Sequence, residues 1–356
     1  MEIKVIIFDV GKGDNIIVEF PENIFGLIDF NKKTSQGEPP SLTYLRLKYD
    51  ELKAKGSNLR ICFINITHQD KDHRHGAVDF FAWIEEKKID IEIWYPKSIN
   101  IPNIISHLRK NNDLENTFNY IYQFHKKKRT RALEGISEVK TIKNFKIYAL
   151  SPLPDAIEED INDRIVNPRN WNPNNTSTAL HFRSNNLQLT FGADLPWLEW
   201  EKVIERLDIS SLKDIYSDFV KASHHGAENA SHTTLWEKLL KDLSHIIFTA
   251  DARYPKKITL DHLSQINKEK LHKYSTFVQN QIFICKNAEN VTNKKNIQWI
   301  ISNNLTGSQN ISSQTIRSIP RKKDPELESD FKFIGWEFMF LESNKVEVFQ
   351  LYPQLQ

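Results

Sequence analysis

The 356-residue sequence contains only two cysteines, Cys62 and Cys285, and each lies inside an apolar run. Isolated cysteines in apolar surroundings usually behave as small buried hydrophobic residues. Two such residues do not make the framework of a disulfide-rich secreted domain, and their scarcity indicates a reducing compartment. We therefore expect a cytoplasmic protein that is stabilised by a packed core.

Long apolar runs are also absent. No uninterrupted stretch approaches the roughly 20 residues that a transmembrane helix needs. The apolar run near the start, residues 3–8, is short and has acidic neighbours, which predicts a strand and not a signal peptide. The sequence therefore predicts no membrane association.

Excess charge of either sign is almost absent, with 48 Lys plus Arg against 46 Asp plus Glu. Any attraction for nucleic acid must then come from a local patch and not from the whole molecule. Residues 125–131 are one candidate, because six of these seven side chains are basic or potentially basic. Such a run either contacts a phosphate backbone near a hydrolytic cleft or forms a solvated helix face.

One short stretch, residues 67–73, concentrates possible metal ligands directly after the apolar run 59–66. Its candidate ligands are His68, Asp70, Asp72 and His73. The preceding run predicts a buried strand, so these side chains lie on the loop that follows it. Imidazole nitrogens and carboxylate oxygens are ligands that Zn²⁺ and Mn²⁺ accept. The alternative interpretation is a polar loop before a helix, and His75 is read as the start of that helix.

These residues resemble the His-x-His-x-Asp-His signature of the metallo-β-lactamase superfamily, with Asp in place of the second His. That variant is typical of hydrolase domains similar to the one in the ComEC DNA-uptake channel. Four further segments match the superfamily in order: residues 10–14, 174–177, 192–194 and 221–226. The resemblance implies an α/β fold, an αββα sandwich of two mixed β-sheets flanked by helices. We expect a single domain over residues 1–356, with insertions near 100–140 and 303–330.

The same resemblance implies a ligand set for two divalent cations. One cation would have His68 and Asp70, the other Asp72, His73 and His225, with Asp194 between them. Most of the superfamily completes the first site with a third His, but this sequence offers Asn174 or Asn175. Zn²⁺ is favoured, and the three carboxylates make Mn²⁺ a rival.

Two histidines, His224 and His225, stand side by side in the fifth matching segment. On extended backbone they would face opposite ways, so only one should bind a cation directly. The resemblance favours His225 as the ligand and His224 as the partner that faces the substrate. In the first segment, Asp14 either holds the ligand loop in place or belongs to a plain Gly-rich turn.

A hydroxide that bridges two cations is a nucleophile suited to phosphoesters and phosphodiesters. Asp72 would be essential to this centre, His224 a candidate general acid and Lys221 a candidate phosphate clamp. The leading prediction is a metal-dependent phosphodiesterase or nuclease. The alternatives are a small-molecule phosphomonoesterase or esterase, and a regulatory or binding subunit with the same fold. The missing third His and the absence of a Gly-His segment near residues 253–256 support that last alternative.

Overall fold

The computed structural model describes most of the chain as far as residue 273 and three short segments beyond it. The described residues are 3–8, 10–32, 37–99, 112–166, 171–210, 212, 214–249, 254–273, 281–285, 335–340 and 346–351. The insertion predicted near residues 303–330 lies outside them.

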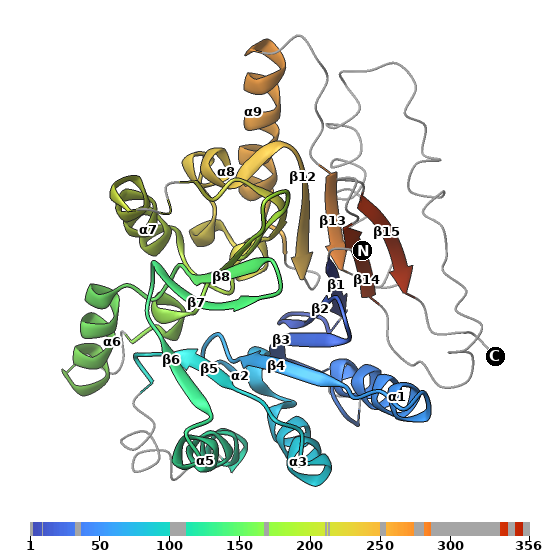
Figure 1. The fold of residues 1–356 in the computed structure, drawn as a ribbon. Helices are drawn as coiled ribbons and strands as arrows, with labels where there is room; N and C mark the ends of the chain where they lie inside the picture. Colours follow the sequence, from blue (N-terminus) through green and yellow to red (C-terminus); the bar gives the residue numbers. More distant parts are fainter. Residues whose placement is uncertain are drawn as a thin grey trace.

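Two mixed β-sheets form the centre of the described part (Figure 1). The first sheet has the strand order β15-β14-β1-β2-β3-β4-β5-β6. Its strands are β1 (Ile3–Phe8), β2 (Asn15–Phe20), β3 (Ile24–Phe30), β4 (Arg60–Asn65), β5 (Ile93–Pro96), β6 (Thr130–Leu133), β14 (Gly335–Phe340) and β15 (Val346–Leu351). The pairs from β3 to β6 are parallel and the other pairs are antiparallel.

The second sheet repeats this division into an antiparallel and a parallel half. Its order is β13-β12-β11-β10-β9-β8-β7, and its pairs from β10 to β13 are parallel. Its strands are β7 (Ser137–Ile142), β8 (Phe145–Ala149), β9 (Leu180–Arg183), β10 (Gln188–Phe191), β11 (Ser217–Lys221), β12 (Leu240–Thr249) and β13 (Gln281–Cys285). Parallel strands require crossover connections, which the helices between them supply.

Helices cover the outer face of each sheet (Figure 1). The first sheet carries α1 (Pro40–Ala54), α3 (Ala77–Lys87) and α5 (Asn112–Lys126), and the second carries α7 (Trp197–Ile209), α8 (Thr233–Leu239) and α9 (Lys257–Lys273). Shorter or peripheral elements are α2 (Lys71–Arg74), α6 (Pro154–Val166), η1 (Pro173–Thr176), η2 (Ser223–Gly226) and η3 (Glu228–Ala230). The α/β prediction of an αββα sandwich is therefore confirmed.

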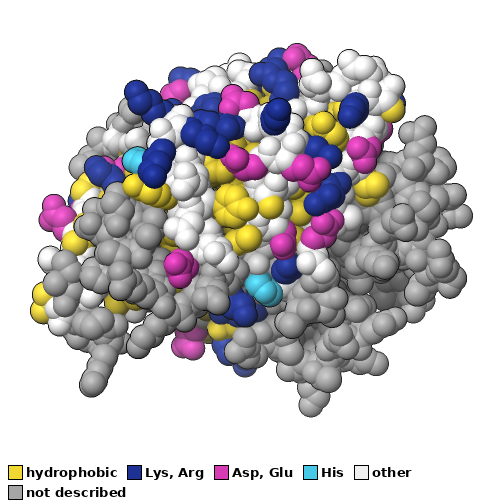
Figure 2. Space-filling view, turned by 90° about the horizontal axis from the view of Figure 1, so that it is seen from below, with side chains coloured by type: hydrophobic (Ala, Val, Ile, Leu, Met, Phe, Trp, Pro, Cys, Tyr) yellow, Lys and Arg dark blue, Asp and Glu magenta, His cyan; other side chains and the backbone are white. Residues whose placement is uncertain are grey.

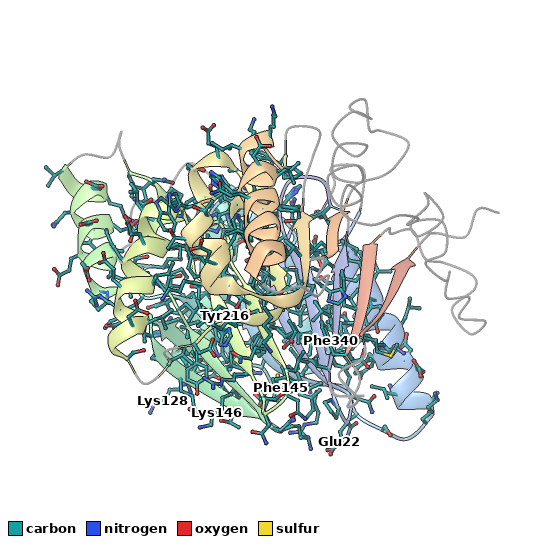
Figure 3. The ribbon with its side chains drawn as sticks, turned by 90° about the horizontal axis from the view of Figure 1, so that it is seen from above. Glu22, Lys128, Phe145, Lys146, Tyr216 and Phe340 are labelled. Atoms are coloured by element: carbon teal, nitrogen blue, oxygen red, sulfur yellow. The ribbon has the colours of Figure 1, made fainter. Side chains whose placement is uncertain are left out.

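Strand β1 shows why the sheets need cover on both faces. All six of its residues are buried. Ile6 and Phe8 face the helices of the first layer, whereas Val5 and Ile7 face the core between the sheets. Phe145 of β8 and Phe340 of β14 reach that same central core from other strands (Figure 3). A strand that is apolar throughout is expected where both faces of a sheet are covered.

The described part of the region predicted as an insertion, residues 112–140, supplies strands to both sheets. Helix α5 leads into β6 at the edge of the first sheet, and β7 follows at the edge of the second. The chain therefore crosses from one sheet to the other here. Throughout the described residues, no helix is both long and apolar enough to cross a membrane.

Between the sheets, Gly26 of β3 leaves room for the ring of Phe63. This ring stacks on Trp94 with centroids 4.1 Å apart and an angle of 3° between the planes. A Cβ atom at position 26 would lie 2.2 Å from Phe63 Cε1. Because the ring is held between neighbours in a close-packed core, it has little freedom to move away.

We predict that Gly26→Ala lowers the free energy of unfolding by about 1–3 kcal/mol, the usual cost of overpacking a core. Gly37→Ala is the matched control, because a Cβ there meets no atom within 4 Å. Urea denaturation followed by tryptophan fluorescence measures both. Equal midpoints for the two variants would show that Phe63 yields without cost.

Candidate metal centre

The predicted ligands come from loops that follow strands of both sheets. Residues 66–70 follow β4, Asp194 follows β10, and η2 follows β11. Strands β3 and β4 run parallel in one sheet, as do β10 and β11 in the other. Side chains beyond the carboxyl ends of parallel strands meet at one edge of a sheet, which is where open α/β sheets usually place their sites.

Donor atoms from these loops form two overlapping groups, each able to hold a metal ion. One consists of His68, His73 and Asp194, and the other of Asp72, His73 and His225. Nε2 of His73 and Nε2 of His225 each lie 3.3 Å from Asp194 Oδ2. Ligand atoms in a tetrahedral Zn²⁺ site, each about 2.0 Å from the ion, lie about 3.3 Å from one another. The spacing of the donors therefore fits a divalent cation.

The donor atoms also lack hydrogen-bond partners, although they are buried. Buried polar atoms without a partner are rare, and each calls for a ligand, an ion or a water molecule. The unpartnered atoms in this cluster are His68 Nε2, His73 Nε2, His225 Nε2, Asp194 Oδ1 and Asn174 Oδ1. A cation that binds these atoms would satisfy them together.

The opposite nitrogens of two rings are fixed by one buried carboxylate, Asp29. Its Oδ2 accepts a hydrogen bond from His73 Nδ1 at 2.7 Å and one from the Thr67 hydroxyl at 2.7 Å. Because that hydroxyl donates to Asp29, it accepts from His68 Nδ1 at 3.0 Å. Both rings therefore carry their proton on Nδ1 and turn the Nε2 lone pair toward the cluster, as metal-binding histidines do.

A second buried carboxylate, Asp14, fixes the orientation of the His225 ring in the same way, through a threonine. Thr249 donates to Asp14 Oδ1 at 2.6 Å and accepts from His225 Nδ1 at 3.0 Å. The backbone N–H of Asp14 also donates to the carbonyl of Asp72 at 3.3 Å. Asp14 therefore lies where it holds the ligand loop in place.

The carboxylates of the centre favour a positive charge among them. Burial would lower the pKa of His73, but Asp194 and Asp29 raise it well above its ordinary value. Burial would likewise raise the pKa of Asp194, but His225 and His73 hold it well below the usual range. The pKa of Asp72 is lowered against burial by His73 and Lys12. Ionised carboxylates around a buried ring favour a proton or a metal cation at the same place.

Lys221 lies beneath the centre and not at its open side. Its ammonium is fully buried, 2.5 Å from Asp14 Oδ2, and it donates to the carbonyl of Ala193 at 3.2 Å. The prediction of a phosphate clamp is therefore corrected, because a substrate does not reach this group. Lys221 instead neutralises Asp14 and ties the first turn to the loop after β10.

The adjacent histidines do not lie on extended backbone, contrary to the expectation. His224 and His225 both have left-handed backbone angles, with φ of 45° and 57°, and Gly226 follows at 83°. This turn still separates the two rings. His225 is fully buried among the donors, whereas His224 is 15 % exposed and its Nε2 lies 3.8 Å from Asp194 Oδ2. Burial lowers the pKa of His224, so its ring is neutral at pH 7.

Two of the predicted positions border the cluster. Asp70 is 40 % exposed and has its carboxylate 3.7 Å from His68 Nε2, and it belongs to neither donor group. Asn174, and not Asn175, faces the centre, since its Nδ2 lies 3.5 Å from His224 Nε2. The side-chain oxygen of Asn175 instead accepts from Asn172. The ligand roles of all these residues stay predictions.

Two glycines allow these loops to approach each other closely. A Cβ at Gly13 would lie 2.0 Å from the carbonyl oxygen of Asp72, and one at Gly192 would lie 2.2 Å from Ser223 Oγ. Gly13 also has a φ of +118°, which other residues rarely adopt. The Gly residues of the matching segments thus serve the packing of the turn, the ligand loop and η2.

Several residues of the centre were missed by the sequence analysis. Asp29, Thr67 and Thr249 orient the histidines, and Tyr254 lies beside them, with its ring centroid 6.4 Å from that of His224. The one available signal was Asp29 itself, a carboxylate in the otherwise apolar strand β3. Its partners, which lie after two other strands, are not visible in the sequence.

A hollow of about 490 Å³ opens beside Asp72. Its lining residues are Val10, Lys12, Asn31, Lys32, Lys71, Asp72 and His75. The ammonium of Lys12 lies 2.8 Å from Asp72 Oδ2 and is 31 % exposed, so it reaches both the ligand and the opening. Lys32 also pairs with Asp79 at 2.7 Å. The three lysines still outnumber these two carboxylates, so the hollow favours an anion.

The sequence matches no protein-family model and no curated relative. Solved structures resemble the chain in fold at identities near 10%. The metallo-β-lactamase fold protein YhfI from Bacillus subtilis is 10% identical, with a TM-score of 0.42 over 80% of this chain and 96% of that one.

Zn²⁺-bound PqqB from Methylobacterium extorquens is 8% identical, with a TM-score of 0.40 over 78% of this chain and 97% of that one. The short form of human tRNase Z is 13% identical, with a TM-score of 0.32 over 62% and 76%. At these values the likeness concerns the course of the chain, and the chemistry of the centre is argued from its own residues.

Proposed function

We propose that the protein is a metal-dependent phosphodiesterase, and that nucleic acid is among its substrates. The His/Asp cluster supports a metal-dependent hydrolase. The observation that favours a phosphodiester is the hollow beside Asp72, which Lys12, Lys32 and Lys71 line. An anionic substrate would be drawn to this entrance, whereas a neutral ester or lactam would gain nothing from it.

The ligand sets of the proposal follow the two donor groups. His68, His73 and Asp194 would hold one cation, with Asp70 and Asn174 beside it. Asp72 and His225 would hold the other cation, and either His73 or Asp194 would be its third ligand. Zn²⁺ is favoured by three imidazoles, and Mn²⁺ is the rival because of the carboxylates. Bound divalent cations lower the pKa of water and stabilise the negative charge that develops on a phosphoryl group.

The residues at the open side would bind and orient the substrate. Lys12 would donate to a non-bridging phosphate oxygen, a contact that needs only a small shift from its ion pair with Asp72. His224 is neutral at pH 7, so it would donate a hydrogen bond to the leaving oxygen and not act as a charged acid. Tyr254, beside both imidazoles, would help to exclude water from this side.

The closer relationship to ComEC-type hydrolase domains is part of this proposal. Its support is the motif of the ligand loop, in which Asp70 stands in place of the second His of the superfamily signature; this carboxylate lies 3.7 Å from His68 Nε2. A carboxylate in place of an imidazole adds negative charge and an oxygen ligand to the centre. It therefore favours the binding of two divalent cations that accept oxygen ligands.

We predict that Zn²⁺ or Mn²⁺ stabilises the protein against thermal unfolding, by about 2.7 kcal/mol when the metal is present at 100 times its Kd. His73→Ala should remove most of this effect, because His73 belongs to both donor groups. Asp29→Asn should weaken binding by about 10- to 100-fold, the usual effect of losing a carboxylate that orients a ligand. Asp208→Asn, a surface carboxylate paired with Lys238, is the control. Elemental analysis and metal titration measure these differences, and equal metal content in all variants would contradict the assignment.

We predict that Asp72→Ala lowers kcat for bis(4-nitrophenyl) phosphate by at least about 100-fold, since electrostatic stabilisation of this order is lost with a single group of a preorganised site. Asp208→Ala should leave the rate unchanged. Parallel assays with 4-nitrophenyl phosphate and single- and double-stranded DNA, each with Zn²⁺ and Mn²⁺, separate a diesterase from a monoesterase. A faster rate on the monoester would favour the small-molecule alternative.

Lys12→Ala should raise KM for the diester by about 10-fold with a smaller change in kcat, because a contact made equally in the bound and transition states affects binding. Lys12→Arg should restore most of the affinity, since a guanidinium also binds phosphate oxygens. The reading of Lys12 as a substrate contact fails if a neutral ester loses as much affinity as the diester does.

A further inference from the structure

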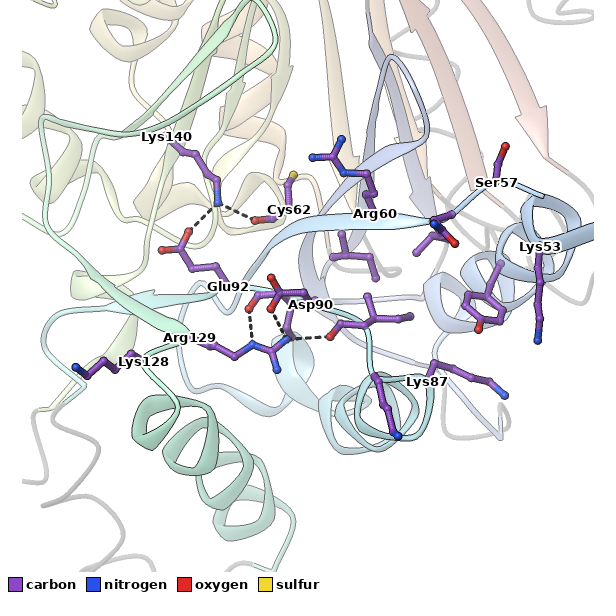
Figure 4. A pocket seen from close by; sticks show the side chains of 17 residues that line it. Lys53, Ser57, Arg60, Cys62, Lys87, Asp90, Glu92, Lys128, Arg129 and Lys140 are labelled. Carbon is purple, nitrogen blue, oxygen red and sulfur yellow. Dashed lines mark hydrogen bonds and ion pairs between the residues drawn. The ribbon is translucent and has the colours of Figure 1, made fainter. Parts of the chain in front are cut away.

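A second pocket lies away from the metal centre and has a volume of about 680 Å³ (Figure 4). Basic side chains from five elements or turns surround it. The basic residues of its lining are Lys53, Arg60, Lys87, Lys88, Lys128, Arg129 and Lys140, and the acidic ones are Asp90 and Glu92. With seven cations against two carboxylates, the lining of this pocket is strongly basic.

The strand directions place this pocket at the opposite end of the first sheet from the metal centre. Arg60 begins β4, whereas the ligand loop follows its last residue, Asn65. Because β5 and β6 run parallel to β4, the residues that precede them, 87–92 and 128–129, lie at the same end as Arg60. Strand β4 alone separates the two ends by about 17 Å at 3.3 Å per residue. The basic run 125–131 therefore does not border the hydrolytic cleft, contrary to the expectation.

Part of the positive charge is neutralised and part is not. Arg129 pairs with Asp90 at 2.9 Å, and Lys140 pairs with Glu92 at 3.0 Å. Among the residues that the structure describes, Lys53, Lys88 and Lys128 form no ion pair. Lys87 pairs with Glu86 at 2.8 Å. Lys53 and Lys87 also lie 5.8 and 5.9 Å from the ring centroid of Tyr49. Cations gathered around a concave surface without partners raise the local concentration of anions.

Both paired acids hold their partners in the pocket wall. Arg129 also donates to the carbonyls of Ile89 and Ile91, and Lys140 to that of Cys62. These two cations are therefore fixed parts of the wall, whereas the exposed lysines at its rim remain available to a ligand. Seen from below, the described surface carries Lys and Arg side chains interspersed with acidic ones (Figure 2).

We propose that this pocket binds the phosphate backbone of a single nucleic-acid strand at a distance from the bond that is cut. The inference rests on the proposed phosphodiesterase function and deepens it, because it names a polymer as the substrate. Two positively charged openings at opposite ends of β4 suit one long polyanion that reaches both. A volume of 680 Å³ admits nucleotides of one strand and is too small for a duplex.

Binding is tested with a fluorescein-labelled 20-nucleotide strand that carries phosphorothioate linkages, so that the metal-loaded full chain does not cut it. Anisotropy titrations at several salt concentrations give the affinity and its salt dependence. Lys53→Gln/Lys128→Gln should weaken binding by at least 10-fold at low salt. The slope of log K against log salt should become shallower by about 1.4, since each lost contact to a single strand removes about 0.7.

The matched control is Lys202→Gln/Lys238→Gln, which removes the same charge from the helices that cover the second sheet. It should change the affinity less than about twofold, as expected for surface charges beyond a Debye length from the ligand. An equal loss of affinity in the two double variants would overturn the assignment of the binding site to this pocket, because binding would then depend on net charge alone.

Two competitors identify the ligand. Inorganic triphosphate and poly-glutamate, each at the same charge concentration as the strand, should displace it poorly. Full displacement by triphosphate would identify a free polyphosphate as the ligand of the pocket. Full displacement by poly-glutamate would identify an acidic peptide as the ligand. Either result overturns the proposal. Both double variants should hydrolyse bis(4-nitrophenyl) phosphate at the wild-type rate, so a failure of the metal chemistry is distinguished from a failure of the pocket.

Discussion

Two buried carboxylates, Asp29 and Asp14, hold the arrangement of the metal centre. Each accepts a hydrogen bond from a threonine that in turn accepts one from an imidazole, Thr67 with His68 and Thr249 with His225. These hydrogen bonds hold the Nδ1 side of each ring, so that Nε2 faces the cluster in the orientation of metal-binding histidines. Lys221, buried against Asp14, offsets part of the charge that this arrangement collects. If these supporting residues were removed, the ligand residues would still be present, but their imidazole rings would no longer be held in orientation.

The sandwich explains why the supports and the ligands come together. Asp29 lies near the end of β3, and the ligand loop follows its parallel neighbour β4, so one carboxylate reaches both histidines of that loop. Asp14 lies in the turn after β1 and meets Thr249 at the end of β12, in the other sheet. The two sheets are thus joined at the site by hydrogen bonds as well as by the apolar core between them. A centre built across two sheets depends on their relative position, while Gly13 and Gly192 allow close approach within each sheet's own loops, to Asp72 and to Ser223.

The sequence allowed prediction of what is local or carried by a motif. The αββα class followed from the resemblance that five segments carry in order, and the spacing of His68, Asp72 and His73 after an apolar run marked them as candidate ligands of one loop. The orientation of Lys221 did not, because its burial depends on Asp14, more than 200 positions earlier in the chain. The left-handed backbone at His224 was also missed, since neither residue type nor spacing specifies it. The basic run was placed at the wrong end of the sheet, because only the parallel pairing of β5 and β6 shows to which edge residues 128–129 belong.

The total charge of the protein is nearly neutral, but opposite charges are concentrated at the two ends of strand β4. Carboxylates gather where β4 ends, and cations gather where it begins. At the carboxylate-rich end, Lys12, Lys32 and Lys71 attract an anion to the hollow beside Asp72, but Asp72 and Asp194 oppose its closer approach until a bound cation offsets their charge. The cations at the other end need no such ion, so they would attract the same substrate whether or not metal is present. A polyanion would therefore be held first at the basic end, and its transfer to the catalytic end would depend on metal. This order follows from the sign of the charges alone and is independent of which metal is bound.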